Sequence, residues 1–127
     1  MMLLSDIRDL LLCEEYGDGG ETDPSIRFGC ASDLMSDVLA FSRAGAVLLT
    51  GLVNVQTVQT AFIAEINAIV FVRGKHPGND VIAAARERKI PLLGTPYSMY
   101  EACGILYSKG LVSTMEAAVA GMPRRAT

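Results

Sequence analysis

The sequence has 127 residues, of which half are apolar and 20% are charged, and its net charge is −3 at pH 7. A chain of this length can bury a core without a metal or a disulfide, and a mean hydropathy of +0.33 excludes a disordered chain. The acidic balance disfavours nucleic acid and anionic membranes as main partners, and the longest apolar runs are far too short to span a bilayer.

Three cysteines, Cys13, Cys30 and Cys103, are an odd number without CxxC spacing, which predicts reduced thiols and a cytoplasmic protein. The single histidine, His76, cannot anchor a histidine-based zinc site, so we expect no metal and no cofactor. The apolar start at residues 1–4 lacks a basic segment, and we expect no signal peptide.

The first predicted element is a helix over residues 5–16, with Ser5 as its cap and Asp6 at the positive end of its dipole. Glycines within residues 17–20 break it, and a loop leads to Pro24. We therefore divide one domain, residues 1–127, into an N-terminal helix and Gly-rich loop (1–22), an α/β core (23–111) and a tail (112–127).

Within the core, short apolar runs alternate with helical patterns, which is typical of βαβ units. The predicted strands cover residues 26–31, 46–50, 68–72 and 90–95. The predicted helices cover residues 34–41, with Ser32 and Asp33 as caps, and 55–65, 82–86 and 98–107, and a short helix is predicted at 113–120. Strands built almost wholly of Val, Leu, Ile, Phe and Ala suit a sheet covered on both faces. The prediction is a three-layer α/β/α fold with a mainly parallel sheet of four or five strands.

Ligands of open parallel sheets bind beyond the carboxyl ends of the strands. Small, polar or charged residues follow each predicted strand, and together they form the candidate site for an anion or a nucleotide. They are Ser32, Asp33, Thr50, Gly51, Asn54, Arg73, Gly74, Lys75, Thr95 and Ser98.

The segment 73–79 is the most suggestive part of this set. Two fixed positive charges, Arg73 and Lys75, flank Gly74 and lead into a helix N-terminus, which could hold a phosphate or a carboxylate. The alternative is a solvated turn shaped by Gly and Pro. Neither a GxGxxG nor a GxxxxGK[ST] motif is present, so no motif supports a dinucleotide or P-loop site.

No convincing catalytic set appears in the sequence. Asp33 and Asp37 stand four residues apart and could act as an acid/base pair, but a cap and a solvated carboxylate are the plainer interpretation. His76 has no motif-placed partner and is expected on the surface. We predict no catalytic residue.

Three segments taken in order, residues 32–39, 48–52 and 90–101, resemble the DRTGG domain in its small stand-alone form. The resemblance covers about residues 23–111. The pentapeptide Asp-Arg-Thr-Gly-Gly itself is absent, and residues 73–75 occupy the loop where other members have a Thr-Gly-Gly-like turn.

The resemblance implies a fold similar to the N-terminal domain of HPr kinase/phosphatase, with related copies in some phosphotransacetylases and beside CBS domains in regulated pyrophosphatases. In those proteins the domain looks regulatory, mediates dimer contacts and is not the catalytic part. Similar stand-alone members are often encoded near iron-hydrogenase subunits and anti-sigma-type kinases, which implies a protein partner from a redox or signalling complex.

Three hypotheses follow. The leading one is a non-catalytic regulatory or ligand-sensing domain acting as a homodimer, whose interface covers the excess of apolar surface. The alternative is a small enzyme or binding protein for an anionic or phosphorylated metabolite, with Arg73 and Lys75 supplying charge and Asp33 or Asp37 acting as base. The third is an adaptor that docks a redox complex and binds no small molecule.

Overall fold

The computed structural model describes residues 1–17 and 22–115 and contains a six-stranded sheet over that part of the chain. Its strands, from one edge to the other, are β2 (Glu14–Tyr16), β7 (Leu92–Gly94), β6 (Ala68–Phe71), β5 (Ala46–Thr50), β4 (Phe28–Ala31) and β8 (Val112–Ser113). All neighbouring strands are parallel except β2, which runs antiparallel to β7. A separate pair joins β1 (Met2–Leu3) to β3 (Ser25–Ile26).

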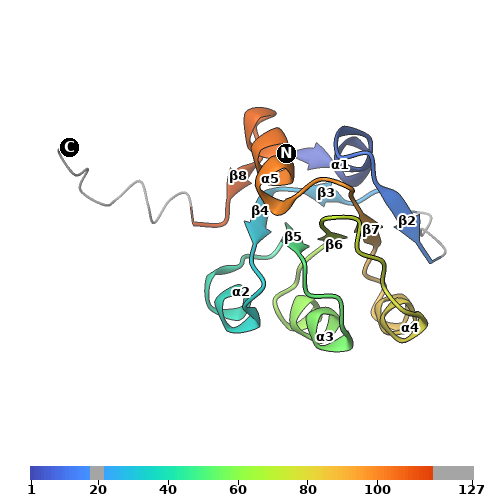
Figure 1. The fold of residues 1–127 in the computed structure, drawn as a ribbon. Coiled ribbons are helices and arrows are strands. Elements are labelled where there is room, and N and C mark those ends of the chain that lie inside the picture. The colour runs from blue at the N-terminus through green and yellow to red at the C-terminus, as the bar shows by residue number, and fades with distance from the viewer. Residues whose placement is uncertain (18–21, 116–127) are drawn as a thin grey trace.

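Helices cover both faces of the sheet (Figure 1). One face carries α2 (Met35–Phe41), α3 (Val55–Ile63) and α4 (Asn79–Glu87), and the other carries α1 (Leu4–Leu10) and α5 (Met99–Ser108). The predicted three-layer α/β/α fold with a mainly parallel sheet is confirmed. The sheet has six strands, however, and not the four or five that the apolar runs indicated.

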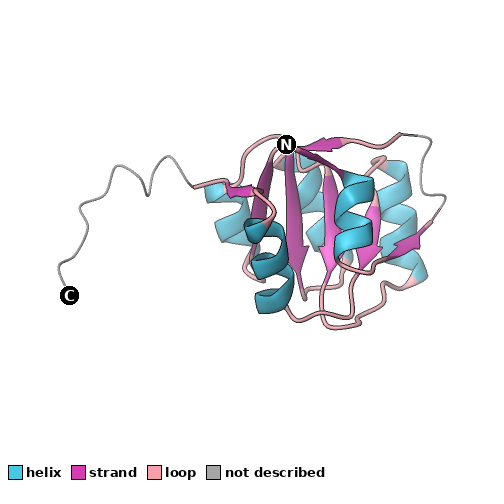
Figure 2. Ribbon diagram, turned by 90° about the horizontal axis from the view of Figure 1, so that it is seen from above, coloured by secondary structure: helices cyan, strands magenta, loops and turns pink. Residues whose placement is uncertain are grey.

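The central strands divide the core into two halves. Figure 2 looks down onto the sheet, with helices in front of it and behind it. All five residues of β5 are buried, and their side chains alternate between the two faces. Val47 and Leu49 pack with α1 and α5, whereas Leu48 packs with the three helices of the opposite layer. The near-continuous apolar runs of the sequence therefore reflect burial on both faces.

The first helix is shorter than predicted. It ends at Leu10, because Leu12 takes a left-handed conformation (φ 53°) and the N–H of Cys13 donates to the carbonyl of Arg8. Such a Schellman ending lets the chain reverse, and Glu14–Tyr16 then pairs with β7 as an edge strand. The prediction of helix for residues 11–16 was wrong, because local apolar spacing does not register the open edge of a distant sheet.

Other predictions about elements also fail locally. Ser5 does not cap α1, since Leu3 holds the cap position. The strand predicted over 26–31 is broken at Arg27, whose N–H donates to the carbonyl of Gly45, so that β3 and β4 belong to different sheets. Ser32 and Asp33 precede α2 but do not cap it, since Leu34 holds the cap position.

The tail does not begin as a helix. Ser113 belongs to β8, which pairs in parallel with β4, and the next two residues form a turn. The side of β4 that faces away from β5 has backbone N–H and C=O groups to pair, and pairing with them favours a strand here over the predicted helix. The rest of the predicted helix, residues 116–120, lies outside the described residues.

The helix endings generate a stability prediction. Glu65 (φ 57°) and Lys89 (φ 58°) have left-handed backbone conformations just after α3 and α4. Gly110 (φ 100°) takes the equivalent position after α5. Because only glycine adopts this conformation without steric cost, we expect Glu65→Gly and Lys89→Gly each to raise the free energy of unfolding by about 1 kcal/mol. Urea denaturation measures this. Gly110→Ala should lower the same quantity by a similar amount, and an unchanged midpoint in all three variants would contradict the argument.

Candidate ligand site at the carboxyl edge of the sheet

A polar cluster lies where β4, β5 and β6 end side by side. One carboxylate oxygen of Asp33, Oδ1, accepts hydrogen bonds from the hydroxyl of Thr50 at 2.9 Å and from the N–H of Gly51 at 2.7 Å. Lys75 reaches back from the loop after β6, and its Nζ donates to the carbonyl of Gly51 at 2.7 Å. Four predicted site residues, Thr50 at the end of β5 and three from the loops after β4, β5 and β6, are thus brought together.

Gly51 leaves a gap in the middle of this cluster. A Cβ at this position would lie 3.4 Å from Nζ of Lys75 and 3.5 Å from both carboxylate oxygens of Asp33. Oδ2 of Asp33 makes no hydrogen bond within the described residues, and the ammonium of Lys75 has donors left over. The edge therefore presents a free acceptor and free donors close to one another.

The pKa of Asp33 is lowered from its ordinary value of 3.8. The hydrogen bond from the N–H of Gly51 is the largest cause, and the hydroxyl of Thr50 and the charges of Lys75 and Arg73 act in the same direction against the opposing effect of desolvation. Asp33 is therefore ionised at neutral pH. It is a good hydrogen-bond acceptor and a weak base.

The loop after β6 is tied to the loop after β7. Arg73 (φ 61°) and Gly74 (φ 69°) are both left-handed, and their N–H groups donate to the carbonyls of Tyr97 at 2.7 Å and Thr95 at 2.8 Å. These loops lead to helices on opposite faces, α4 and α5, which marks the switch point where open α/β sheets bind ligands. The exposed guanidinium of Arg73 has no hydrogen bond or ion pair within the described residues.

Thr95 and Ser98 have clear structural roles. The fully buried hydroxyl of Thr95 donates to the carbonyl of Leu11 at 2.6 Å, which secures the end of α1 to β7. Ser98 caps α5 through the N–H of Glu101 and forms a capping box with that residue.

Asn54 and Ser32 also shape the backbone of this edge. Asn54 caps α3 by accepting from the N–H of Thr57 at 2.9 Å, and Ser32 accepts from the N–H of Leu34 at 3.0 Å. Their contacts hold the loops in which Gly51 and Asp33 lie.

The sequence did not indicate that β2 reaches this edge. The hydroxyl of Tyr16 lies 2.6 Å from Nδ1 of His76 and 3.3 Å from Oε2 of Glu14. The ring lies over Gly94, where a Cβ would come within 2.8 Å of that hydroxyl. His76 is exposed, as predicted, but it anchors the loop after β6 to the edge strand.

Cavities among the described residues lie away from this edge. One of about 810 Å³ lies between α5 and strands β4 and β8, and another of about 650 Å³ lies beside α1, β2 and α4. The first is lined mainly by apolar side chains and by glycine. The second holds charged groups that are partly paired with one another.

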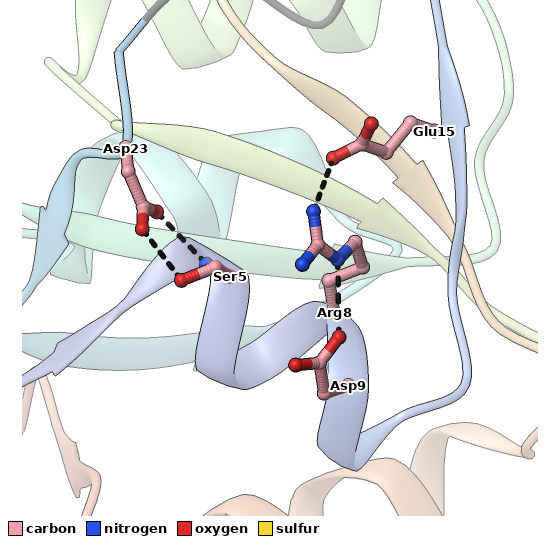
Figure 3. A network of polar contacts seen from close by, with 5 residues as sticks. All are labelled: Ser5, Arg8, Asp9, Glu15 and Asp23. Carbon is pink, nitrogen blue, oxygen red and sulfur yellow. Dashed lines mark hydrogen bonds and ion pairs between the residues drawn. The ribbon is translucent and has the colours of Figure 1, made fainter.

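Figure 3 shows the paired groups beside the second cavity. Arg8 bonds Asp9 and Glu15 at 3.1 Å each, and Ser5 donates to Asp23. These contacts connect α1 to β2 and to the segment before β3, so we assign them a structural role.

The three thiols are free and half-buried, and burial raises the pKa of each, that of Cys13 to about 12. None is therefore a ready nucleophile. Residues 1–17 and 22–115 contain no group of three or more potential metal-ligating side chains. No helix in the same range is long and apolar enough to cross a membrane.

No family model matches the sequence, and no curated protein does. Among solved structures, the chain is similar to the CBS and DRTGG domains of the regulatory region of Clostridium perfringens pyrophosphatase, complexed with its activator diadenosine tetraphosphate. The TM-score is 0.67 and the sequence identity 17%, over 81% of this chain and 45% of that one. The chain thus spans less than half of that region, and the two share a fold of the CBS and DRTGG kind.

The lowered pKa of Asp33 generates a prediction. A group whose pKa is lower in the folded state stabilises the fold above its unfolded pKa, and this contribution is lost as the pH falls through the folded pKa. Asp33→Asn should therefore destabilise the protein at pH 7, and its difference from the wild type should shrink below about pH 4. Urea denaturation at several pH values measures this.

Asp37→Asn is the matched control, since this nearby carboxylate on α2 makes no hydrogen bond within the described residues. A difference for Asp33→Asn that stays constant from pH 7 to pH 3 would contradict the assignment.

Proposed function

We propose that this chain is a non-catalytic regulatory domain that senses a small anionic ligand at the carboxyl edge of its sheet and acts as a homodimer. The observation that carries the proposal is the cluster of Asp33, Gly51 and Lys75, with the unpaired guanidinium of Arg73 at the neighbouring switch point. The shared fold with a regulatory region that binds diadenosine tetraphosphate supports it.

The chemistry of the edge favours a phosphorylated compound that also carries hydroxyl groups. Guanidinium and ammonium groups bind phosphate oxygens, and an ionised carboxylate accepts hydrogen bonds from sugar hydroxyls. Arg73 and Lys75 supply the first function and Oδ2 of Asp33 the second. Nucleotides combine both groups and are the ligand class that we propose.

Binding suits these residues better than catalysis. A general base works best with a pKa near the operating pH, whereas the contacts of Asp33 lower its pKa. The alternative of a small enzyme, with Asp33 or Asp37 as base, therefore has the weaker support. In the sensing role, the domain would pass ligand binding on to a protein partner of a redox or signalling complex, as the resemblance to stand-alone DRTGG proteins implies.

Thermal unfolding with diadenosine tetraphosphate, ATP, AMP and inorganic phosphate tests the proposal. Ligand at a hundred times its dissociation constant should stabilise the fold by ~2.7 kcal/mol, which raises the melting temperature by several degrees. Arg73→Gly should abolish most of this shift by weakening binding about ten- to hundredfold. The same variant should be no less stable without ligand, because it also relieves a left-handed arginine.

Lys89→Gly is the matched control. It removes one positive charge at a left-handed position, but beyond the carboxyl end of α4 and far from the site, so it should keep the full ligand shift. Absence of a shift with every compound, or an equal loss in both variants, would overturn the site. Chemical conversion of a bound compound, lost in Asp33→Ala, would favour the enzyme instead.

A further inference from the structure

The outer face of α5 is an exposed surface beside the apolar cavity between α5 and strands β4 and β8. Five residues at helical spacing, Tyr100, Glu101, Gly104, Tyr107 and Ser108, form this face, and all five line the cavity. The side chains of both tyrosines lie largely in solvent, with 89% of Tyr100 and 62% of Tyr107 exposed. Two such rings on one helix face are costly to leave uncovered.

Gly104 lies at the centre of this face, and nothing explains it within the described residues. It stands inside a helix, where glycine costs up to about 1 kcal/mol relative to alanine, and its φ is not left-handed. A Cβ there would meet no atom within 4 Å. No neighbouring segment of the described chain therefore requires a glycine at this position. A second helix that crossed closely over Gly104 would require one.

We propose that this face binds the same face of a second copy, so that two α5 helices cross antiparallel at Gly104 about a twofold axis. This contact would be the interface of the homodimer described under the proposed function, and it therefore rests on that proposal. An isologous contact requires a surface that is complementary to itself.

The α5 face meets that requirement. In an antiparallel pair centred on Gly104, residues four before and four after the centre face each other, as do residues three before and three after. Tyr100 then faces Ser108 of the other copy, and Glu101 faces Tyr107. Each phenol thus gains a hydrogen-bond partner, since only one carboxylate oxygen of Glu101 is engaged in capping α5.

The rings also supply much of the area that a stable dimer needs. A buried tyrosine contributes roughly 150–250 Å², so four of them bury roughly 600–1,000 Å² across the twofold axis. A standard interface buries about 1,600 Å² in total. Val112, an exposed residue of β8 that lines the cavity, extends the apolar contact.

Light scattering coupled to size-exclusion chromatography tests the inference on the full chain. The wild type should have twice its monomer mass of 13.6 kDa at tens of micromolar. Gly104→Glu should shift it to monomer, with a dissociation constant raised at least about tenfold, because two carboxylates would meet at the crossing. The open space at Gly104 and the higher helix propensity of glutamate should leave the monomer folded, which circular dichroism checks.

Ala83→Glu is the matched control, since it adds the same charge to an exposed position of α4 on the opposite layer and should remain dimeric. Gly104→Cys adds a test of position. A disulfide forms only when the two Cα atoms lie within about 7 Å, so oxidation should link the two copies through residue 104. The wild type, oxidised in parallel, measures any linkage through its own cysteines.

A dimer that survives Gly104→Glu and does not cross-link through Gly104→Cys would overturn the interface and leave the homodimer standing. A monomeric wild type would overturn both. Neither result bears on ligand sensing, because Arg73→Gly and the thermal shift report on the carboxyl edge, away from Gly104.

Discussion

Burial of the parallel sheet on both faces is the constraint on which the rest of this structure depends. The strands β5 and β6 are wholly buried, so their side chains leave no place for polar chemistry along their length. Polar groups must therefore gather where the strands end and the loops begin. The carboxyl edge also carries the N-terminal ends of the helices that follow, where caps such as Asn54 and Ser98 are needed. The polar residues at this edge therefore include some that hold the helix ends in place.

Strand order then decides which of these residues meet. Because β4, β5 and β6 are neighbours, the loop after β4 places Asp33 against the end of β5, and Lys75 reaches the same point from the loop after β6. Gly51 lies between them and leaves their charges accessible. The chain then changes face, since β6 leads to α4 and β7 to α5, and Arg73 stands at that change. Most polar groups at this edge hold loops and helix ends in place, and several others keep hydrogen-bonding capacity that the described residues do not fill.

The two helix layers are unequal, and this inequality bears on assembly. Within the described residues, three helices cover one face and two cover the other (Figure 1). The side of α5 towards β4 and β8 lines a cavity and carries exposed tyrosines. The high apolar content of the chain is found mainly in the buried core, and two of its exposed apolar side chains, Tyr100 and Tyr107, lie on this helix.

The alternation of short apolar runs with helical patterns was sufficient to predict the α/β class, the parallel sheet and the core helices, because burial on both faces leaves a strong local signature. The same logic predicted that Asp33, Thr50, Gly51 and Lys75 lie at one edge. Local spacing could not show that Glu14–Tyr16 is an edge strand or that Val112–Ser113 joins β4, since each depends on backbone hydrogen bonds offered by a strand far away in the sequence.

The hydrogen bonds within the site were likewise set by tertiary structure. Asp33 and Ser32 read as helix caps because their type suits that position, but strand order gave Asp33 a stronger partner in the N–H of Gly51. Thr95 looked available to a ligand, yet the end of α1 takes its hydroxyl. Residue types thus determined which groups stand at the edge. Only the packing of distant segments decided which of those groups lack a hydrogen-bond partner, because the partners come from elements far away in the sequence.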